Sequence, residues 1–247
     1  MSRWKASLIH FSLSLLVAAV AIGLLLGVWY PPPYFQAGGA DRLLLLVVGV
    51  DVILGPLLTL IVFDTRKPEL KRDLVIIVAV QLVALVYGFH VMLQSRPAFL
   101  VAAVDRFIVV SANQLEPDDL AQAREPRWRK LSWSGPVLVA TERPDSGSER
   151  SDLLFSALAG KDIEQLPRHY VDYAHETPNL LRRAQPLSRL RELNPDKPHD
   201  LDAWLKRHRR QEGSVVWLPI VARMNDITML MDRKTGEPLG AIALRPW

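Results

Sequence analysis

The sequence contains no cysteine. It therefore forms no disulfide, offers no thiolate to a metal and has no cysteine nucleophile. It also has no G-x-S-x-G elbow, no P-loop, no G-x-G-x-x-G and no H-E-x-x-H motif. Each of these motifs supports a particular chemistry, so the sequence gives no indication of hydrolysis, nucleotide binding or zinc catalysis by these routes.

A strong charge of one sign is also missing. The formal net charge is only +4 over 247 residues, and it is divided almost evenly between the first 95 residues and the rest. Affinity for nucleic acid depends on neutralising phosphates with a strongly basic surface. The near-neutral C-terminal part therefore argues against this class of function, and we expect no nucleic-acid partner.

Long apolar runs are abundant, but nearly all of them lie in the first 95 residues. Three windows of about 20 residues can each cross roughly 30 Å of hydrocarbon as a helix. They are residues 8–28, 43–63 and 74–93. The first is too long for the apolar part of a signal peptide, and no A-x-A-like site follows it, so we expect a retained anchor. We predict a transmembrane region over 1–95 and one folded domain over 96–247.

The positively charged flanks of the windows predict the orientation. Lys and Arg are concentrated before the first window and between the second and third, whereas the first loop has only Arg42. In a bacterium this pattern predicts a multi-pass inner-membrane protein with a cytoplasmic N-terminus and a periplasmic C-terminal domain. Aromatic residues after the first window are expected at the outer interface with the membrane lipids. They are Trp29, Tyr30, Tyr34 and Phe35.

Asp51 lies inside the second window, where an unpaired carboxylate is costly. Counted from the outer edges of the windows, Tyr87 lies at nearly the same depth, so its hydroxyl is the expected donor. Two alternatives remain open: an internal hydrogen bond that fastens the three helices, or contact with another membrane helix. Gly55 and Pro56 follow on the same helix and are expected to bend it, because proline removes a backbone hydrogen bond.

Small residues recur every four positions in the first window, at Ala19, Gly23 and Gly27. Such a stripe allows a second helix backbone to approach closely. That second helix can belong to this chain or to another protein. The candidate helix-contact residues in the membrane region are Ala19, Gly23, Gly27, Asp51, Gly55, Pro56 and Tyr87.

From residue 98 the pattern changes to strand-like runs, first FLVAAVDRFIVV and then PVLVATE. Helix starts are expected at Ser151, at Thr177 with Pro178, and at Asp200, the last helix running to Gly213. The chain then returns to strands in VVWLPIVA, ITMLMD and PLGAIAL. This order predicts an α+β domain with a mainly antiparallel sheet.

The segment HYVDYAHE is the best cluster of polar groups in this domain. Its two histidines, His169 and His175, are six residues apart and do not share a helix face, so we expect neither a metal nor another cofactor. Its two tyrosines, Tyr170 and Tyr173, are expected to pack inward or onto a partner. They are the candidate contact residues of the domain.

Several segments together point to one family. They are MSRWKAS at the start, WYPPPYF, GVDVILGPLLTLIVF, AVDRFIVV, GKDIEQLPRHYVDY and the closing LRPW. Through them the chain resembles, nearly end to end, the TfpX/TfpZ type IV pilin accessory proteins. The resemblance implies signature positions at Asp51, Gly55 and Pro56, whereas His169 stands where the family pattern suggests another tyrosine.

The resemblance also implies a function. It describes a non-enzymatic, chaperone-like factor that binds its cognate major pilin in the inner membrane and modulates pilus assembly. The pilus assembly machinery is a further candidate partner. Two rival classes remain: a membrane-anchored enzyme that modifies pilin, for which only HYVDYAHE offers candidate groups, and a periplasmic sensor, whose output would depend on another protein.

Overall fold

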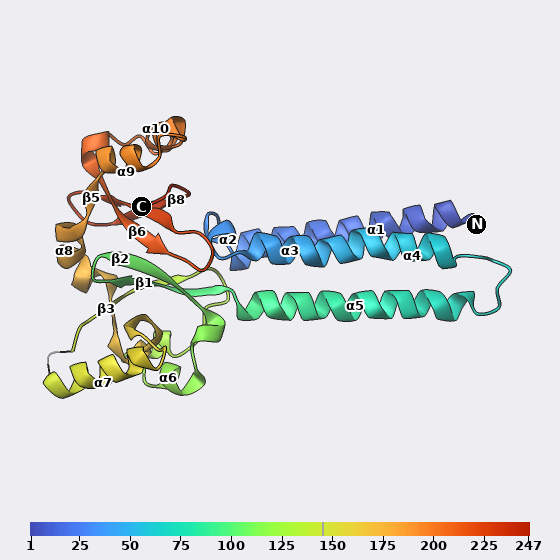
Figure 1. Ribbon diagram of the computed structural model, residues 1–247, viewed down its shortest axis with the longest axis horizontal. Helices are drawn as coiled ribbons and strands as arrows, with labels where there is room; N and C mark the ends of the chain where they lie inside the picture. The colour runs from blue at the N-terminus through green and yellow to red at the C-terminus, as the bar shows by residue number, and fades with distance from the viewer. Residues whose placement is uncertain (145) are drawn as a thin grey trace.

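The computed structural model describes residues 1–144 and 146–247. Three long apolar helices lie side by side, and a domain of strands and shorter helices lies at one end of them (Figure 1). The predicted fold class, three N-terminal apolar helices followed by an α+β domain with a mostly antiparallel sheet, is confirmed.

Each of the three spans is long enough to cross a membrane, with 27, 23 and 25 residues. The first consists of α1 (Arg3–Leu24) and a π-helical turn (Leu25–Trp29). The second consists of α3 (Ala40–Gly49), a π-helical turn (Val50–Leu54) and α4 (Gly55–Val62). The third is α5 (Leu70–Gln94), and the short helix α2 (Tyr34–Ala37) lies between the first two spans.

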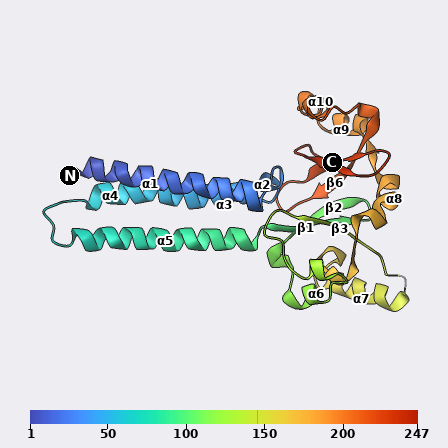
Figure 2. The same cartoon turned by 180° about the vertical axis from the view of Figure 1, so that it is seen from behind.

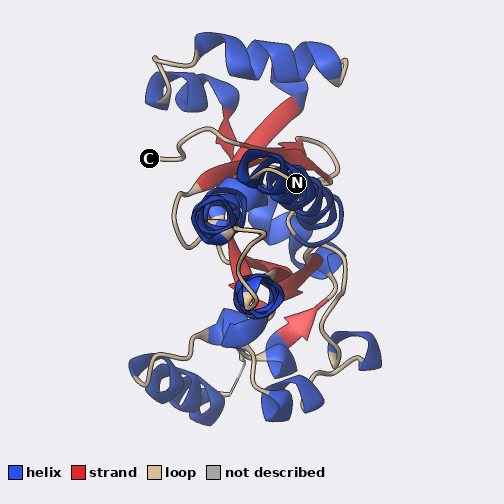
Figure 3. Ribbon diagram, turned by 90° about the vertical axis from the view of Figure 1, so that its right-hand side faces the viewer, coloured by secondary structure: helices blue, strands red, loops and turns tan. Residues whose placement is uncertain are grey.

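The spans form a bundle in which the middle span contacts both of the others. Figure 3 shows them end on, with the N-terminus toward the viewer. The end of the bundle beside the C-terminal domain, here the domain-proximal end, holds α2 and the last turn of α5 (Figure 1). The N-terminus and the basic loop around Arg66 and Lys67 lie at the opposite end.

The domain is built on one mixed sheet of eight strands. They are β1 (Pro97–Ala103), β2 (Arg106–Ser111), β3 (Val137–Thr141), β4 (Tyr170–Val171), β5 (Gln185–Pro186), β6 (Val215–Val221), β7 (Ile227–Asp232) and β8 (Pro238–Ile242). The order is β4-β3-β1-β2-β6-β7-β8, and β5 also pairs with β6. Among the described strands, the β1–β3 and β2–β6 pairs are parallel and the other pairs are antiparallel.

Both faces of the sheet are buried. Successive side chains of a strand point to opposite sides of the sheet, so a single strand contributes to the core on each face. Leu100 and Ala102 join the core under α8 (Tyr173–Arg183), whereas Phe99 and Val101 join the core on the other face. Helices α9 (Leu187–Leu193) and α10 (Pro198–Arg207) cover the β6–β8 half of the sheet (Figure 2).

The remaining helices lie near β1 and β3, at the opposite end of the domain from α10 (Figure 1). They are α6 (Pro117–Ala121) and α7 (Gly147–Leu158). Single 3-10 turns occupy Ala112–Gln114, Pro126–Trp128, Ile163–Gln165, Pro167–His169 and Glu212–Ser214.

Several local predictions about the domain are wrong. The run FLVAAVDRFIVV is two paired strands rather than one, because Val104 takes a positive φ of 59° and turns the chain. Helix α7 begins at Gly147 with Ser146 as its cap, so Ser151 lies inside the helix. Likewise Pro178 lies inside α8, which begins at Tyr173, and α10 ends at Arg207, well before Gly213.

Candidate functional site

The first span is fastened to the third at the domain-proximal end. The hydroxyl of Tyr30 donates to the backbone carbonyl of Met92 at 2.7 Å and lies 3.1 Å from the hydroxyl oxygen of Ser95. Tyr30 and Trp29 are both buried among side chains of the three spans. Burial raises the pKa of the Tyr30 hydroxyl, which keeps it a donor. These two aromatic side chains are therefore covered by protein rather than open to lipid, and their position at the outer interface stays a prediction.

The segment after Tyr30 reaches into the C-terminal domain. Ala37, at the end of α2, is fully buried in the core beside residues of β1, β2, β6 and β7. Its carbonyl oxygen accepts hydrogen bonds from the backbone N–H of Met224, at 2.9 Å, and of Asn225, at 3.3 Å. Tyr34 packs against the same core, and burial raises its pKa to about 12. The first loop is thus part of the domain's core.

Two further contacts join the bundle to the domain. The backbone N–H of Gly135 donates to the carbonyl of Val28 at 2.8 Å. The guanidinium of Arg96 donates to the carbonyls of Leu93, at 2.6 Å, and Ser132, at 3.1 Å. Burial is also the main cause of a lowered pKa at Arg96. A partner that contacts this protein therefore meets a bundle and a domain held in one arrangement.

Inside the membrane region, Asp51 pairs with Gln81 of α5. The side-chain amide of Gln81 donates to the Asp51 carboxylate oxygen Oδ1 at 2.7 Å and to the Asp51 carbonyl at 3.2 Å. Tyr87, the donor expected from the sequence, is 69% exposed and is not the residue that donates to Asp51. The expected donor was therefore wrong, although an internal hydrogen bond between spans does exist.

Gly55 makes the Asp51–Gln81 contact possible. A Cβ atom on Gly55 would lie 2.1 Å from the amide nitrogen of Gln81, so any larger residue would displace that side chain from its place beside Asp51. Gly55 follows the π-helical turn that contains Asp51, and Pro56 comes next. The carbonyl of Pro56 accepts a hydrogen bond from the hydroxyl of Ser7 at 2.8 Å. The signature residues thus take part in packing and hydrogen bonding between spans.

A second polar contact lies closer to the N-terminal end of the bundle. Nδ1 of His10 is 2.6 Å from the hydroxyl oxygen of buried Thr59. Sequence reasoning missed Ser7, Thr59 and Gln81 as partners. For Gln81 a signal existed, because it is the one amide inside the apolar run from residue 74 to 86.

The small-residue stripe on the first span faces away from the bundle. Ala18, Ala21 and Leu25 are buried against the other spans. Ala19, Gly23 and Gly27 are exposed, and a Cβ on either glycine would meet no atom of this chain within 4 Å. The sequence left two partners open for the stripe, a helix of this chain or a helix of another protein. Among the described residues, a helix of this chain does not pack against the stripe.

The segment HYVDYAHE is mostly structural. Tyr170 is fully buried and donates its hydroxyl to the carbonyl of Glu164. Tyr173 donates to the carbonyl of Gly236 at 2.6 Å and stacks on Phe107. Both tyrosines therefore pack inward, and Tyr170 has no surface to offer a partner. Burial raises the pKa of Tyr173 to about 12.

The histidines of this segment do not converge. His169 is buried beside Arg168, whereas the side chain of His175 is 59% exposed. Burial, and then the nearby charges of Arg168 and Arg124, lower the pKa of His169. Within residues 1–144 and 146–247, no group of three or more His, Asp or Glu side chains is arranged to hold a metal ion.

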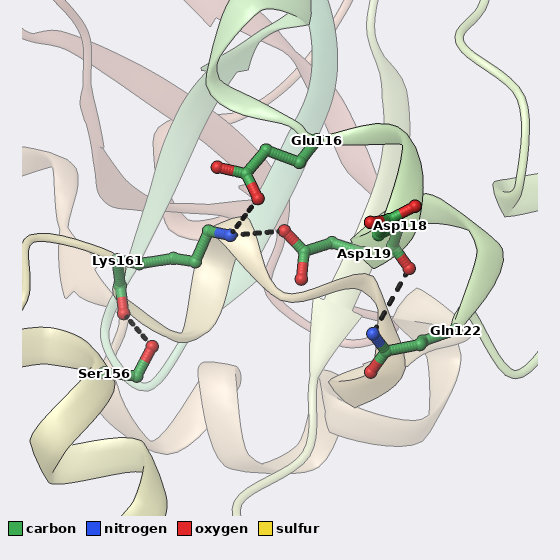
Figure 4. Close-up of polar contacts among 6 residues, drawn as sticks. All are labelled: Glu116, Asp118, Asp119, Gln122, Ser156 and Lys161. Carbon is green, nitrogen blue, oxygen red and sulfur yellow. Dashed lines mark hydrogen bonds and ion pairs between the residues drawn. The ribbon is translucent and has the colours of Figure 1, made fainter.

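The segment GKDIEQ that precedes HYVDYAHE is anchored to α6 through Lys161 (Figure 4). The ammonium of Lys161 donates to the carboxylates of Glu116, at 3.0 Å, and Asp119, at 2.5 Å, and these bonds raise its pKa. The hydroxyl of Ser156 in α7 donates to the Lys161 carbonyl at 2.7 Å. This polar group joins α6 to the end of α7.

Comparison with known proteins identifies the family. A curated fimbrial assembly protein of Dichelobacter nodosus, serogroup I, is 34% identical over 233 residues, which is 93% of this chain and 90% of the relative. The chain belongs to the fimbrial assembly proteins. The serogroup E1 protein of the same organism is 33% identical over the same shares of the two chains. A third relative, from serogroups C1 and C2, is 40% identical over 121 residues, or 48% of this chain and 92% of the relative.

The family model described as "Fimbrial assembly protein FimB" matches residues 1–39. These residues contain the outward stripe of the first span, Tyr30 and the α2 segment that enters the domain core. The matches support the expected role in type IV fimbrial assembly. The matching proteins are named fimbrial assembly proteins, and the TfpX/TfpZ name does not appear among them. No solved structure matches this chain.

Proposed function

We propose that this fimbrial assembly protein is a non-enzymatic, chaperone-like factor of type IV pilus assembly that binds its cognate major pilin in the bacterial inner membrane. In this proposal the N-terminus is cytoplasmic and the C-terminal domain is periplasmic. The basic residues gathered at the N-terminal end of the bundle support that orientation. The full-length relationship to fimbrial assembly proteins supports the process.

The observation that carries the proposal is the outward stripe on the first span beside a firmly attached domain. The stripe lets a foreign helix approach closely within the lipid. Before assembly, the resemblance implies, a pilin is one membrane helix that carries a periplasmic head. A factor that contacts both parts gains from effective concentration, because the second contact forms within one complex.

The stripe is tested by Gly23→Leu, which fills it with a large side chain. Since nothing in this chain lies within 4 Å of that position, the protein should fold and accumulate normally. Co-purification of the major pilin from detergent-solubilised membranes should fall about ten-fold, as expected for a loss of roughly 1.4 kcal/mol. Val83→Leu, at an exposed position of α5, is the matched control and should leave pilin binding unchanged.

The same proposal assigns binding rather than catalysis to the domain. Replacing His169 with Gln and His175 with Ala should therefore leave pilus assembly intact. Loss of pili in this variant, with the protein still abundant in the membrane, would favour a pilin-modifying enzyme instead.

Unchanged pilin co-purification in Gly23→Leu would count against binding through the stripe.

A further inference from the structure

A groove opens between α1 and α5, away from the outward stripe. It has a volume of about 340 Å³ and is lined mainly by apolar side chains of these two helices, among them Leu13, Val78 and Leu82. The middle span contacts both helices and also contributes to the lining. The groove lies within the apolar part of the bundle, so whatever fills it enters from the lipid or from another membrane helix.

The Asp51–Gln81 pair lines this groove at mid-depth. Asp51 lies 11 residues after Ala40 and Gln81 lies 11 residues after Leu70, the first residues of their spans. At 1.5 Å per helical residue, each lies about 16 Å from its span's first residue, near the centre of the bilayer. A polar group at that depth has no water to satisfy it.

The pair has more acceptors than donors. The amide nitrogen of Gln81 serves Oδ1 of Asp51, but Oε1 of Gln81 is buried without a hydrogen-bond partner among the described residues. Oδ2 of Asp51 likewise receives no hydrogen bond in the part of the chain that the structure describes. An unsatisfied carboxylate oxygen in hydrocarbon is unfavourable, and a donor from outside would satisfy Oδ2 of Asp51, whereas Oε1 of Gln81 is buried out of reach of an outside partner.

We infer that this groove receives a transmembrane helix that carries a hydrogen-bond donor side chain near its centre, and that the donor binds the free carboxylate oxygen Oδ2 of Asp51. The apolar walls suit the aliphatic side chains of such a helix. A lipid acyl chain fits the walls equally well but has no donor for this oxygen, so complementarity favours the helix. The inference rests on the proposed function in one respect: the helix is that of a pilin, and since one helix cannot lie on the outward stripe and in this groove at once, it belongs to a second pilin subunit.

Photo-cross-linking in cells tests the occupant directly. Leu82, which lines the groove, is replaced by p-benzoylphenylalanine in the full-length protein, co-expressed with the pilin. Val83, which is 70% exposed and next along α5, receives the same photo-cross-linker as a control for groove-specific contact. We expect an adduct with the pilin helix from position 82 and at least about five-fold less from position 83.

Asp51→Asn tests the chemistry of recognition. Asparagine has nearly the shape of aspartate and still accepts the hydrogen bond from Gln81, so the bundle should fold. Its own amide can donate to Oε1 of Gln81, which removes the need for an outside donor. The adduct from position 82 should therefore fall about ten-fold, whereas Gln81→Leu, which removes the donor to Oδ1 and leaves both carboxylate oxygens of Asp51 free, should not lower it.

The outcomes separate the two proposals. Adducts from position 82 to lipid alone, while pilin still co-purifies, overturn the groove inference and leave the proposed function standing. A pilin adduct that persists in Asp51→Asn, or that is lost in Gln81→Leu, overturns the role of Asp51 as the acceptor. An adduct with a different membrane protein that disappears in Asp51→Asn supports the groove as a donor-recognising site and contradicts pilin as its client.

Discussion

Met224 packs directly over the backbone of Gly39. A Cβ on Gly39 would lie 2.6 Å from Cγ of Met224, and Gly39 has a φ of +78°, in the left-handed region. The contact joins the loop between the first two spans to the turn between β6 and β7. Together with the hydrogen bond from Met224 to Ala37, it fixes where the domain sits on the bundle.

Gly39→Ala should therefore loosen the junction between the bundle and the domain. The left-handed backbone alone costs an alanine about 1 to 2 kcal/mol, and Met224 must also move. The apparent melting temperature of the full-length protein in detergent should fall by several degrees. Gly213→Ala is the matched control, because a Cβ there meets nothing within 4 Å and its φ is not positive. Equal melting temperatures for the two variants would contradict the assigned contact.

Tyr30→Phe removes one buried hydroxyl and little else. The carbonyl of Met92 loses its side-chain donor, and a buried hydrogen bond of this kind contributes about 1 kcal/mol. Thermal unfolding in detergent should show a loss of a few degrees. Tyr87→Phe removes a hydroxyl from an exposed tyrosine of α5 and should have no such effect. If both variants melt like the original protein, Tyr30 does not fasten the two spans.

The spans were predictable because lipid demands long apolar helices whatever they pack against. The structure extends them slightly, for instance to Arg3 and Trp29 in the first span. Rotation about the helix axis was not predictable from depth alone. Tyr87 and Gln81 are six residues apart, which places them about 120° apart around the axis of α5, and it is Gln81 that is directed at Asp51.

The junction was harder to predict for a related reason. Aromatic residues after an apolar helix are typical of a lipid interface, and only the packing of the three spans reveals that Trp29 and Tyr30 are covered by protein. The hairpin of β1 and β2 escaped prediction because its turn contains Val104 and Asp105 rather than an Asn-Gly type of signal. Local sequence carried little information about the contacts that bury Trp29 and Tyr30, or about where the chain turns between β1 and β2.

His169 makes the stability of the protein depend on pH. Burial and the nearby arginines lower its pKa in the folded state, so the fold favours the neutral ring. Its contribution is complete above about pH 6.5, the ordinary pKa of histidine. Below that pH the unfolded chain takes up a proton before the folded protein does, so stability falls as the pH drops through this range.

We therefore expect the original protein to lose more stability between pH 7 and pH 5 than His169→Gln, with both followed by thermal unfolding in detergent. Glutamine keeps an acceptor for the guanidinium of Arg168 but does not titrate. His175→Gln alters an exposed histidine and is the matched control. Parallel pH profiles for the original protein and His169→Gln would mean that the ring is protonated equally in both states.

Gly55→Ala and Gln81→Leu should act on the same interaction. A Cβ at position 55 displaces the Gln81 amide, and Gln81→Leu removes it, so each single change breaks the hydrogen bond to Asp51. Hydrogen bonds between membrane helices contribute about 0.6 to 1.7 kcal/mol. The double variant should therefore lose less stability than the two single losses added together, because the bond can be lost only once.

The measurement is a double-mutant cycle of unfolding free energies in detergent or lipid. Gly49→Ala in the same span provides the control pairing with Gln81→Leu, because a Cβ on Gly49 meets nothing within 4 Å. That pair should be additive within about 0.5 kcal/mol. Additivity in the Gly55 cycle as well would show that Gly55 does not act through Gln81. The glycine at this position would then serve only the close packing of the spans.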